Sequence, residues 1–123
     1  MIMDNKVVHF EIAAKDPDKT MKFFGKAFDW KFEKASDNYW MVTTGDDSDP
    51  GINGGILRKT EQEITVANSI GVEDIDVSIK NVKDAGGKIV KDKFPIPGMG
   101  WMAYFSDPDG YYHGLWEEDS EAK

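Results

Sequence analysis

A histidine and a glutamate lie two positions apart near the start of the chain, His9 and Glu11 in the segment Val7–Ala14. This segment alternates apolar and polar residues, which predicts a half-buried strand with both polar side chains on one face. A carboxylate beside a histidine can act as a general base when the pair is partly withdrawn from water. His9 and Glu11 are therefore the candidate catalytic residues. Two other interpretations stay open, a hydrogen-bonded strand histidine and a solvated or salt-bridged glutamate.

The elements that must position this pair occur twice along the chain. The first half has a strand over residues 7–14, then helix-capping residues at Asp16-Pro17-Asp18 and a helix with an apolar face. Three short strands are expected next, at residues 30–34, 39–44 and 52–57. After residues 58–63 the order repeats, with a strand at 64–72, a helix that begins near Asp74 and ends at Gly86-Gly87, and strands at 88–91, 100–106 and 111–117.

Two β-α-β-β-β units predict an α+β fold. Each helix can cover only one face of its own sheet, so the two mixed sheets are expected to pair through their other faces and form a concave cleft. We expect a single domain over residues 1–123, with one module over about residues 6–58 and a second over about residues 64–118. Residues 118–123 are expected to fray.

Composition narrows the class of function. The 123 residues include no cysteine and carry a formal net charge of −8. The acidic balance excludes nucleic acid as an expected partner, and the sequence from Met1 to Lys6 has no apolar run for a signal peptide or a membrane span. We therefore expect a cytoplasmic protein without membrane contact. Exposed sheet edges and four tryptophans favour a homodimer.

The chain resembles the vicinal oxygen chelate superfamily, which includes glyoxalase I, bleomycin-resistance proteins and extradiol dioxygenases. The most specific part is the turn Asp107-Pro108-Asp109-Gly110 with its flanking strands, and the likeness extends over nearly the whole chain. The segments that carry the resemblance are residues 8–12 with 16–18, 23–30, 52–56, 70–76, 102–110 and 114–117.

The resemblance implies a place for a metal. In catalytic members, four side chains from the first and last strand of each half hold a divalent ion that acts on substrate oxygens as a Lewis acid. The first of these positions falls on His9, and the others fall on Gly54-Gly55, Ala67 and Gly114, none of which has a ligating side chain. One ligand of four cannot hold a metal. We therefore expect no family-type metal and no other cofactor, with a divalent metal as the alternative.

Strand alternation gives the remaining candidates for contact with a ligand. Small residues stand where metal ligands would be, which suggests room for a ligand, and Trp116 offers a flat apolar surface. Trp40 and Trp101 are included, although the pattern leaves open which face each takes. The ligand-binding set is Trp40, Ala67, Ser69, Trp101, Tyr112, Gly114 and Trp116. His113 is expected to be structural, and Phe94–Gly100 is either a lid or a rigid connection.

Three functions remain in competition. The first is a glyoxalase or bleomycin-resistance-like protein that binds a small molecule without the family metal. The second is a metal-dependent lyase, isomerase or dioxygenase of the same superfamily that acts on a small oxygenated substrate. The third is an interaction module whose open sheet faces another protein.

Overall fold

The computed structural model describes residues 5–59 and 64–123. It divides into two compact units, which we call the N-terminal module (His9–Ala67) and the C-terminal module (Asn68–Lys123 with the start of the chain up to Val8). Residues 1–4 and most of the expected connection at 58–63 lie outside the described residues. Each module has the order β-α-β-β-β, which confirms the predicted α+β fold of two repeats.

The N-terminal module consists of β1 (Val7–Ala14), α1 (Pro17–Phe28), β2 (Lys31–Ser36), β3 (Tyr39–Thr43) and β4 (Gly54–Arg58). β2 pairs with β3 and β3 with β4 in antiparallel register, whereas β4 runs parallel to β1. Asp16 caps α1 as predicted, since its carboxylate accepts a hydrogen bond from the backbone N–H of Lys19 at 3.2 Å.

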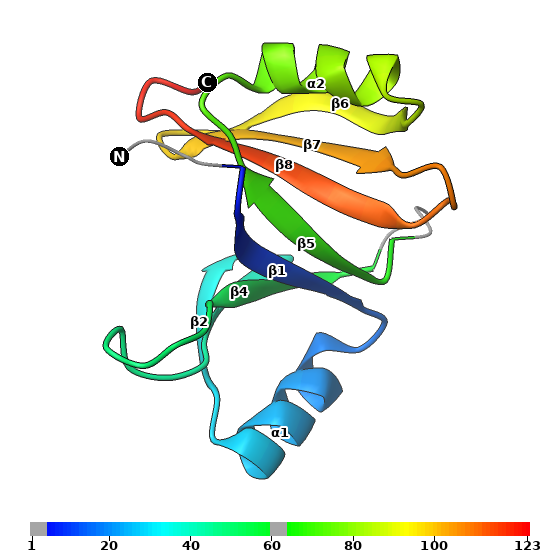
Figure 1. Ribbon diagram of the computed structural model, residues 1–123. Coiled ribbons are helices and arrows are strands. Elements are labelled where there is room, and N and C mark those ends of the chain that lie inside the picture. Colours follow the sequence, from blue (N-terminus) through cyan, green and yellow to red (C-terminus); the bar gives the residue numbers. More distant parts are fainter. Residues whose placement is uncertain (1–4, 60–63) are drawn as a thin grey trace. The chain divides into compact units, whose positions relative to one another are not determined.

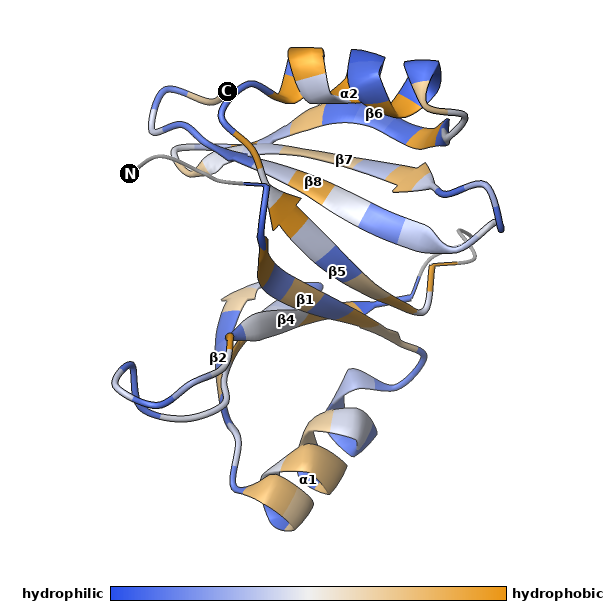
Figure 2. Cartoon of the chain, in the orientation of Figure 1, coloured by the Kyte–Doolittle hydropathy of each residue, from blue (hydrophilic) through white to orange (hydrophobic). Residues whose placement is uncertain are grey.

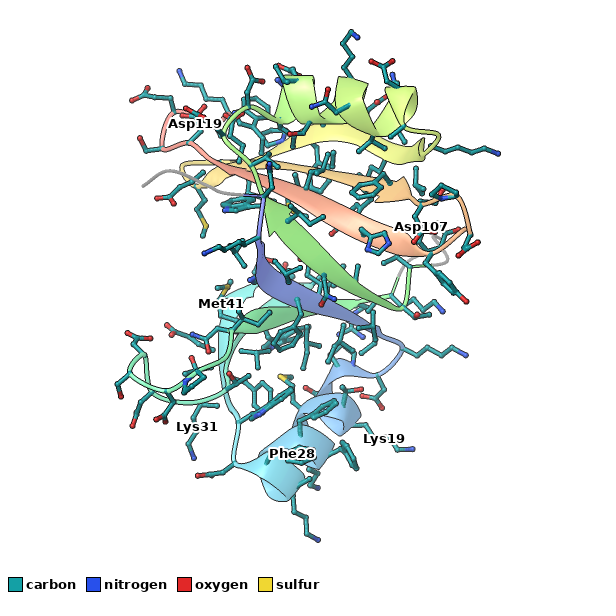
Figure 3. All side chains as sticks on the ribbon, in the orientation of Figure 1. Lys19, Phe28, Lys31, Met41, Asp107 and Asp119 are labelled. Carbon is teal, nitrogen blue, oxygen red and sulfur yellow. The ribbon has the colours of Figure 1, made fainter. Side chains whose placement is uncertain are left out.

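One face of this sheet packs against α1 and forms the core of the module. Trp40, Val42 and Ile56 are buried there, and Phe10 and Met21 pack against them. Because side chains alternate along a strand, the neighbours of these residues take the opposite face. That face, which α1 leaves uncovered, carries His9, Glu11, Tyr39, Met41 and Gly55. Met41, labelled in Figure 3, is 37% exposed.

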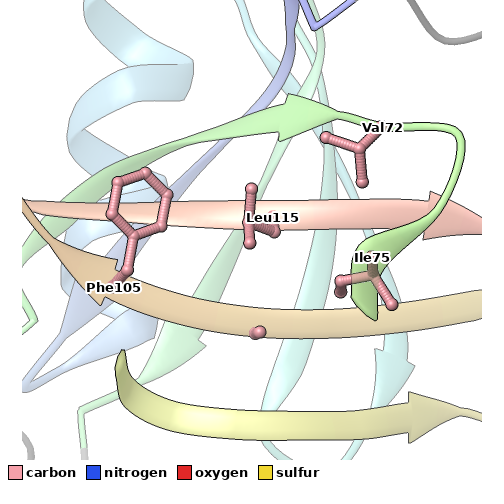
Figure 4. Packing of buried hydrophobic residues seen from close by; sticks show 5 residues of the cluster. Val72, Ile75, Phe105 and Leu115 are labelled. Atoms are coloured by element: carbon pink, nitrogen blue, oxygen red, sulfur yellow. The ribbon is translucent and has the colours of Figure 1, made fainter. Parts of the chain in front are cut away.

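The C-terminal module consists of β5 (Val66–Gly71), α2 (Ile75–Asp84), β6 (Lys88–Ile96), β7 (Gly100–Ser106) and β8 (Tyr112–Glu118). β5 runs parallel to β8, while β8–β7 and β7–β6 are antiparallel. α2 covers one face of this sheet (Figure 1), and both helices mix hydrophobic and hydrophilic residues (Figure 2). The core contains Val72, Ile75, Ala103, Phe105 and Leu115 (Figure 4).

Local signals placed both ends of α2 and the last turn correctly. The Asp74 carboxylate accepts hydrogen bonds from two N–H groups of the first turn of α2, and Gly86 adopts φ +99° just after the helix. Asp107 accepts from the N–H groups of Asp109 and Tyr111, and Gly110 closes the turn with φ +87°. The predicted hairpin between β7 and β8 is therefore present.

Two predictions about the C-terminal module were wrong, the end of the strand at 88–91 and the frayed tail. β6 continues to Ile96, because Phe94 and Ile96 also pair with β7, so the segment 94–100 is a hairpin. Of the two interpretations left open for this segment, the hairpin agrees with the rigid connection and not with the lid. The C-terminal tail does not fray, because Ala122 is buried and its carbonyl accepts a hydrogen bond from the Gly98 N–H at 2.9 Å. The tail and the hairpin turn thus stabilise each other.

Within residues 5–59 and 64–123, neither helix is long and apolar enough to span a membrane.

Candidate functional site

His9 of β1 is hydrogen-bonded to a tyrosine from another strand. Its Nε2 lies 2.9 Å from the hydroxyl oxygen of Tyr39, which stands at the start of β3. The two residues are 30 positions apart in sequence. The β-sheet brings them together, because β4 lies between β1 and β3 and both partners take the face that α1 leaves uncovered.

Tyr39 fills the space above Gly55. A Cβ atom built on Gly55 would overlap the Tyr39 hydroxyl and would lie 2.7 Å from its ring carbon Cε1. The expectation that the glycine leaves room for a ligand at this position was therefore wrong. The absence of a side chain at residue 55 instead allows Tyr39 to lie across β4 and reach His9.

Glu11 lies beside this pair. It pairs with Gly55 in the register of β1 and β4, and it is only 6% exposed. Burial lowers the pKa of His9, an effect that the negative charge of Glu11 partly offsets. The imidazole is therefore neutral near pH 7, and a neutral ring keeps one nitrogen as an acceptor and one as a donor. The predicted neighbourhood of His9 and Glu11 is present, with Tyr39 as a third member.

The lowered pKa of His9 makes stability depend on pH. The unfolded chain, with an ordinary histidine pKa near 6.5, takes up a proton more readily than the folded chain. The stability that the neutral His9 ring contributes is fully present above pH 6.5. It is lost as the pH falls from 6.5 towards the lowered pKa of His9 in the folded chain, because the unfolded chain then binds a proton that the folded chain does not. Urea unfolding at pH 7.5, 6.5 and 5.5 should therefore show a steeper loss of stability for the native chain than for His9→Gln. Parallel curves for the two proteins would contradict this assignment.

The uncovered face of the C-terminal module holds most of the other candidates. Tyr112, Gly114 and Trp116 of β8 alternate with residues that face α2, and Ser69 of β5 lies opposite Gly114. The Trp116 ring extends over Gly100. A Cβ atom built on Gly100 would lie only 2.8 Å from Cζ2 of Trp116. Ala67, at the start of β5, is buried and is grouped with the N-terminal module.

The space above Gly114 is also occupied. A Cβ atom at this position would lie 2.8 Å from the Ser69 hydroxyl and 3.2 Å from the terminal methyl group of Met102. Met102 of β7 is 5% exposed. The prediction of open space was therefore wrong here as well, because a serine and a methionine fill it.

Trp40 and Trp101 were assigned to the ligand-binding set incorrectly. Trp40 is buried in the core beneath α1, next to Val42 and Ile56. Trp101 packs against the core beneath α2, and its indole N–H donates to the Asp119 carboxylate at 3.0 Å. Both therefore lie on the helix-covered faces, where they stabilise the modules.

His113 and Glu117 face α2. The His113 ring stacks on Phe105 and its Nε2 lies 2.8 Å from the Asp107 carboxylate, so it ties β8 to the turn that Figure 3 marks at Asp107. Hydrogen bonding to His113 lowers the pKa of Asp107. Glu117 accepts from the Ile75 N–H at the start of α2. Both lie on the face opposite Gly114, which agrees with the alternation of side chains along β8. The expectation that His113 is structural is therefore confirmed.

Tyr39 and Met102 were missed by the sequence analysis. A partial signal existed for Tyr39, because the residue next to a buried Trp40 in a strand must take the other face. That it lies over Gly55 depends on the register between β3 and β4, which the sequence pattern does not specify. Met102 carried no signal beyond an apolar side chain in a strand.

A surface hollow of about 190 Å³ lies elsewhere in the N-terminal module. It is lined by the connection between β3 and β4, including Asp46, Asp47 and Asp49. The Thr44 hydroxyl closes the base of this connection by donating to the Ile52 carbonyl at 2.7 Å. The hollow contains none of the predicted site residues.

The residues at the four implied metal positions do not fit a metal. His9 Nε2 is engaged with Tyr39, and the three remaining positions lack ligating side chains. The described part of the chain contains no group of three or more histidine or carboxylate side chains arranged to bind a metal ion. These residues therefore do not provide the ligands that a metal ion acting as a Lewis acid would need.

Comparison with known proteins decides the family. The model of the Glyoxalase/Bleomycin resistance protein/Dioxygenase superfamily matches residues 6–113. The chain belongs to this superfamily. Within the superfamily, a probable lactoylglutathione lyase of Vibrio parahaemolyticus is 28% identical, over 88% of this chain and 87% of that protein. A putative glyoxylase, CFP32, of Mycobacterium tuberculosis is 26% identical, over 87% of this chain and 43% of that protein.

Solved structures of other proteins share the fold. A methylmalonyl-CoA epimerase in complex with methylmalonyl-CoA and NH4+ superposes with a TM-score of 0.66 at 19% identity, over 97% of this chain and 98% of that one. The hypothetical protein BH1468 from Bacillus halodurans superposes with a TM-score of 0.63 at 18% identity, over 96% of this chain and 97% of that one. At these identities the superpositions establish the architecture alone.

Proposed function

We propose that this superfamily member binds a small organic molecule without the family's metal, on the sheet faces that its helices leave uncovered. These faces carry the polar and aromatic groups suited to contact with a ligand, including Glu11, Ser69 and Trp116. Ligand pockets combine apolar walls with a few fixed polar groups, and these residues supply both kinds of contact.

The observation that carries this proposal is the hydrogen bond between His9 and Tyr39 above Gly55. It engages Nε2 of His9, the residue at the first implied metal position, and the Tyr39 side chain fills the space at the second. Metal-independent binding is therefore the function that the residues support best.

A thermal-shift screen of small metabolites tests the proposal. A ligand that binds only the folded chain stabilises it by about 2.7 kcal/mol at 100 times its dissociation constant, enough to raise Tm by several degrees. The shift should appear after treatment with a chelator and should shrink in Trp116→Leu. Tyr111→Phe is the matched control, since Tyr111 is 69% exposed at a turn. A shift that appears only after metal is restored would refute metal-independent binding.

The second candidate is an enzyme, and the names of the relatives favour it. Lactoylglutathione lyases and methylmalonyl-CoA epimerases occur among the similar proteins. His9 and Glu11 would then be the proton-transferring groups, with or without a metal. Assays for both activities, compared between the native chain and His9→Ala, separate this candidate from a binding protein.

A cytoplasmic homodimer without nucleic-acid or membrane contact stays a prediction. The tryptophans give weaker grounds for a dimer in the structure, because Trp40 is buried and the other three are only partly exposed. The edge strand β6 also carries Lys88, Lys91 and Lys93, and charged edges discourage strand pairing between molecules.

A further inference from the structure

Ser69 is the only buried side chain in the described part of the chain whose polar atom has no hydrogen-bond partner. It is 0% exposed and lies in β5, opposite Gly114 of β8. Buried hydroxyl groups in folded proteins almost always find a partner, since leaving one unsatisfied costs free energy. Alanine would fill nearly the same volume without this cost. The fold alone therefore gives no reason for a serine.

The hydroxyl lies on the uncovered face of the C-terminal module, close to Gly114 and to a flexible side chain. The terminal methyl group of Met102 stands beside it, 3.2 Å from the point where a Cβ of residue 114 would be. Methionine has an unbranched chain with several rotatable bonds, so it can change rotamer at low cost. A change of the Met102 rotamer would make room above Gly114, next to the Ser69 hydroxyl, without movement of the backbone.

The surroundings restrict what the hydroxyl can bind. On this face β7 presents Gly100, Met102 and Tyr104, and β8 presents Gly114 and Trp116. The two residues that pair with Gly114, Ser69 and Tyr104, are uncharged, whereas the charged residues of this face, Lys91 and Glu118, are exposed and pair with Tyr104 and Gly100. An ion buried against a single hydroxyl group would lose far more hydration than it regained. A neutral carbonyl group attached to a flat apolar body meets the hydroxyl, the methionine and the Trp116 ring together.

We propose that Ser69 donates its hydrogen bond to a neutral carbonyl oxygen of the ligand, and that Met102 covers this subsite until the ligand enters. This inference rests on the proposed function, because it assigns one contact of the same binding protein. It makes the ligand class narrower: a small, uncharged, unsaturated or aromatic carbonyl compound.

Two matched pairs of probes test the contact. Acetophenone and α-methylstyrene have nearly the same shape, as do cyclohex-2-en-1-one and 3-methylenecyclohexene, but only the first of each pair has a carbonyl oxygen. Titrations followed by the amide NMR signals of residues 69, 102 and 114 should show the ketones binding about three- to tenfold more tightly. Ser69→Ala should abolish this preference, and Ser106→Ala, at a second buried serine, should retain it.

The apo form of Ser69→Ala gives an independent readout. Its Tm should equal or exceed that of the native chain, because the substitution removes an unsatisfied hydroxyl. A fall of more than about 3 °C would show that Ser69 makes a structural hydrogen bond, and it would overturn the inference. Equal binding of ketones and hydrocarbons would overturn the inference but leave the proposed function standing. No binding of any probe, together with no hit in the metabolite screen, would overturn both.

Discussion

Replacing Gly55 with alanine is expected to lower the free energy of unfolding by about 2 kcal/mol, within the usual range for inserting an atom into a filled space. The new Cβ would overlap the Tyr39 hydroxyl, so the Tyr39 side chain must leave its place across β4. The hydrogen bond between Tyr39 and His9 would then break. Urea denaturation at pH 7.5 measures the change.

A double-mutant cycle shows whether Tyr39 is the cause. In a Tyr39→Ala background, Gly55→Ala should cost much less, with a coupling energy above about 1 kcal/mol. Gly54→Ala is the matched control. Its Cβ would meet the backbone and ring of Phe10 rather than Tyr39, so its cost should be the same in both backgrounds. If the cost of Gly55→Ala did not change when Tyr39 was removed, the assigned packing would be wrong.

Gly114→Glu is expected to destabilise the chain more strongly, by about 3–5 kcal/mol, as for an uncompensated buried charge. This substitution introduces the carboxylate that the superfamily resemblance would place at this position. The first atom of the new side chain would already lie 2.8 Å from the Ser69 hydroxyl and 3.2 Å from Met102. The carboxylate would enter a region where Ser69 and Met102 are buried.

Two further variants separate the contributions of size and charge. Gly114→Ala adds only the Cβ and should cost about 1–2 kcal/mol, whereas Gly114→Gln adds a neutral side chain of nearly the same size as glutamate. Burial raises the pKa of the new carboxyl group, so the deficit of Gly114→Glu relative to Gly114→Gln should shrink as the pH falls from neutral towards about 4.3, the ordinary pKa of glutamate, because protonation removes the buried charge. A stable Gly114→Glu protein at pH 7.5 would contradict the packing above Gly114.

Most of the architecture was predictable because its signals are local. Asp16, Asp74 and the turn Asp107–Gly110 each specify an element boundary through hydrogen bonds within a few residues. β6 was underestimated because Pro95 and Pro97 indicate a loop. Pro95 is tolerated in β6 because β6 is an edge strand, where a missing N–H need not break a ladder.

The candidate site was less predictable because it depends on contacts between strands. Strand alternation placed Glu11, Ser69 and Trp116 on the correct faces, but it could not show what fills the space above a glycine. Tyr39 and Met102 fill those spaces because of the register between β3 and β4 and between β7 and β8. The sequence of a single strand does not determine this register. Likewise, Ala122 is held by the hairpin turn at Gly98, a tertiary contact that the acidic tail sequence does not suggest.

The most direct test of metal-independent binding is a long-range ¹H–¹⁵N NMR spectrum of the two histidine rings at pH 7.5, before and after one equivalent of Zn²⁺. His113→Gln assigns the signals, since the chain contains only two histidines. We predict that the His9 ring is neutral, that its signals do not change with Zn²⁺, and that Tyr39→Phe shifts the Nε2 resonance. A stoichiometric change of the His9 ring nitrogens on addition of Zn²⁺ would show that the His9 ring binds the metal, and it would contradict the proposed function.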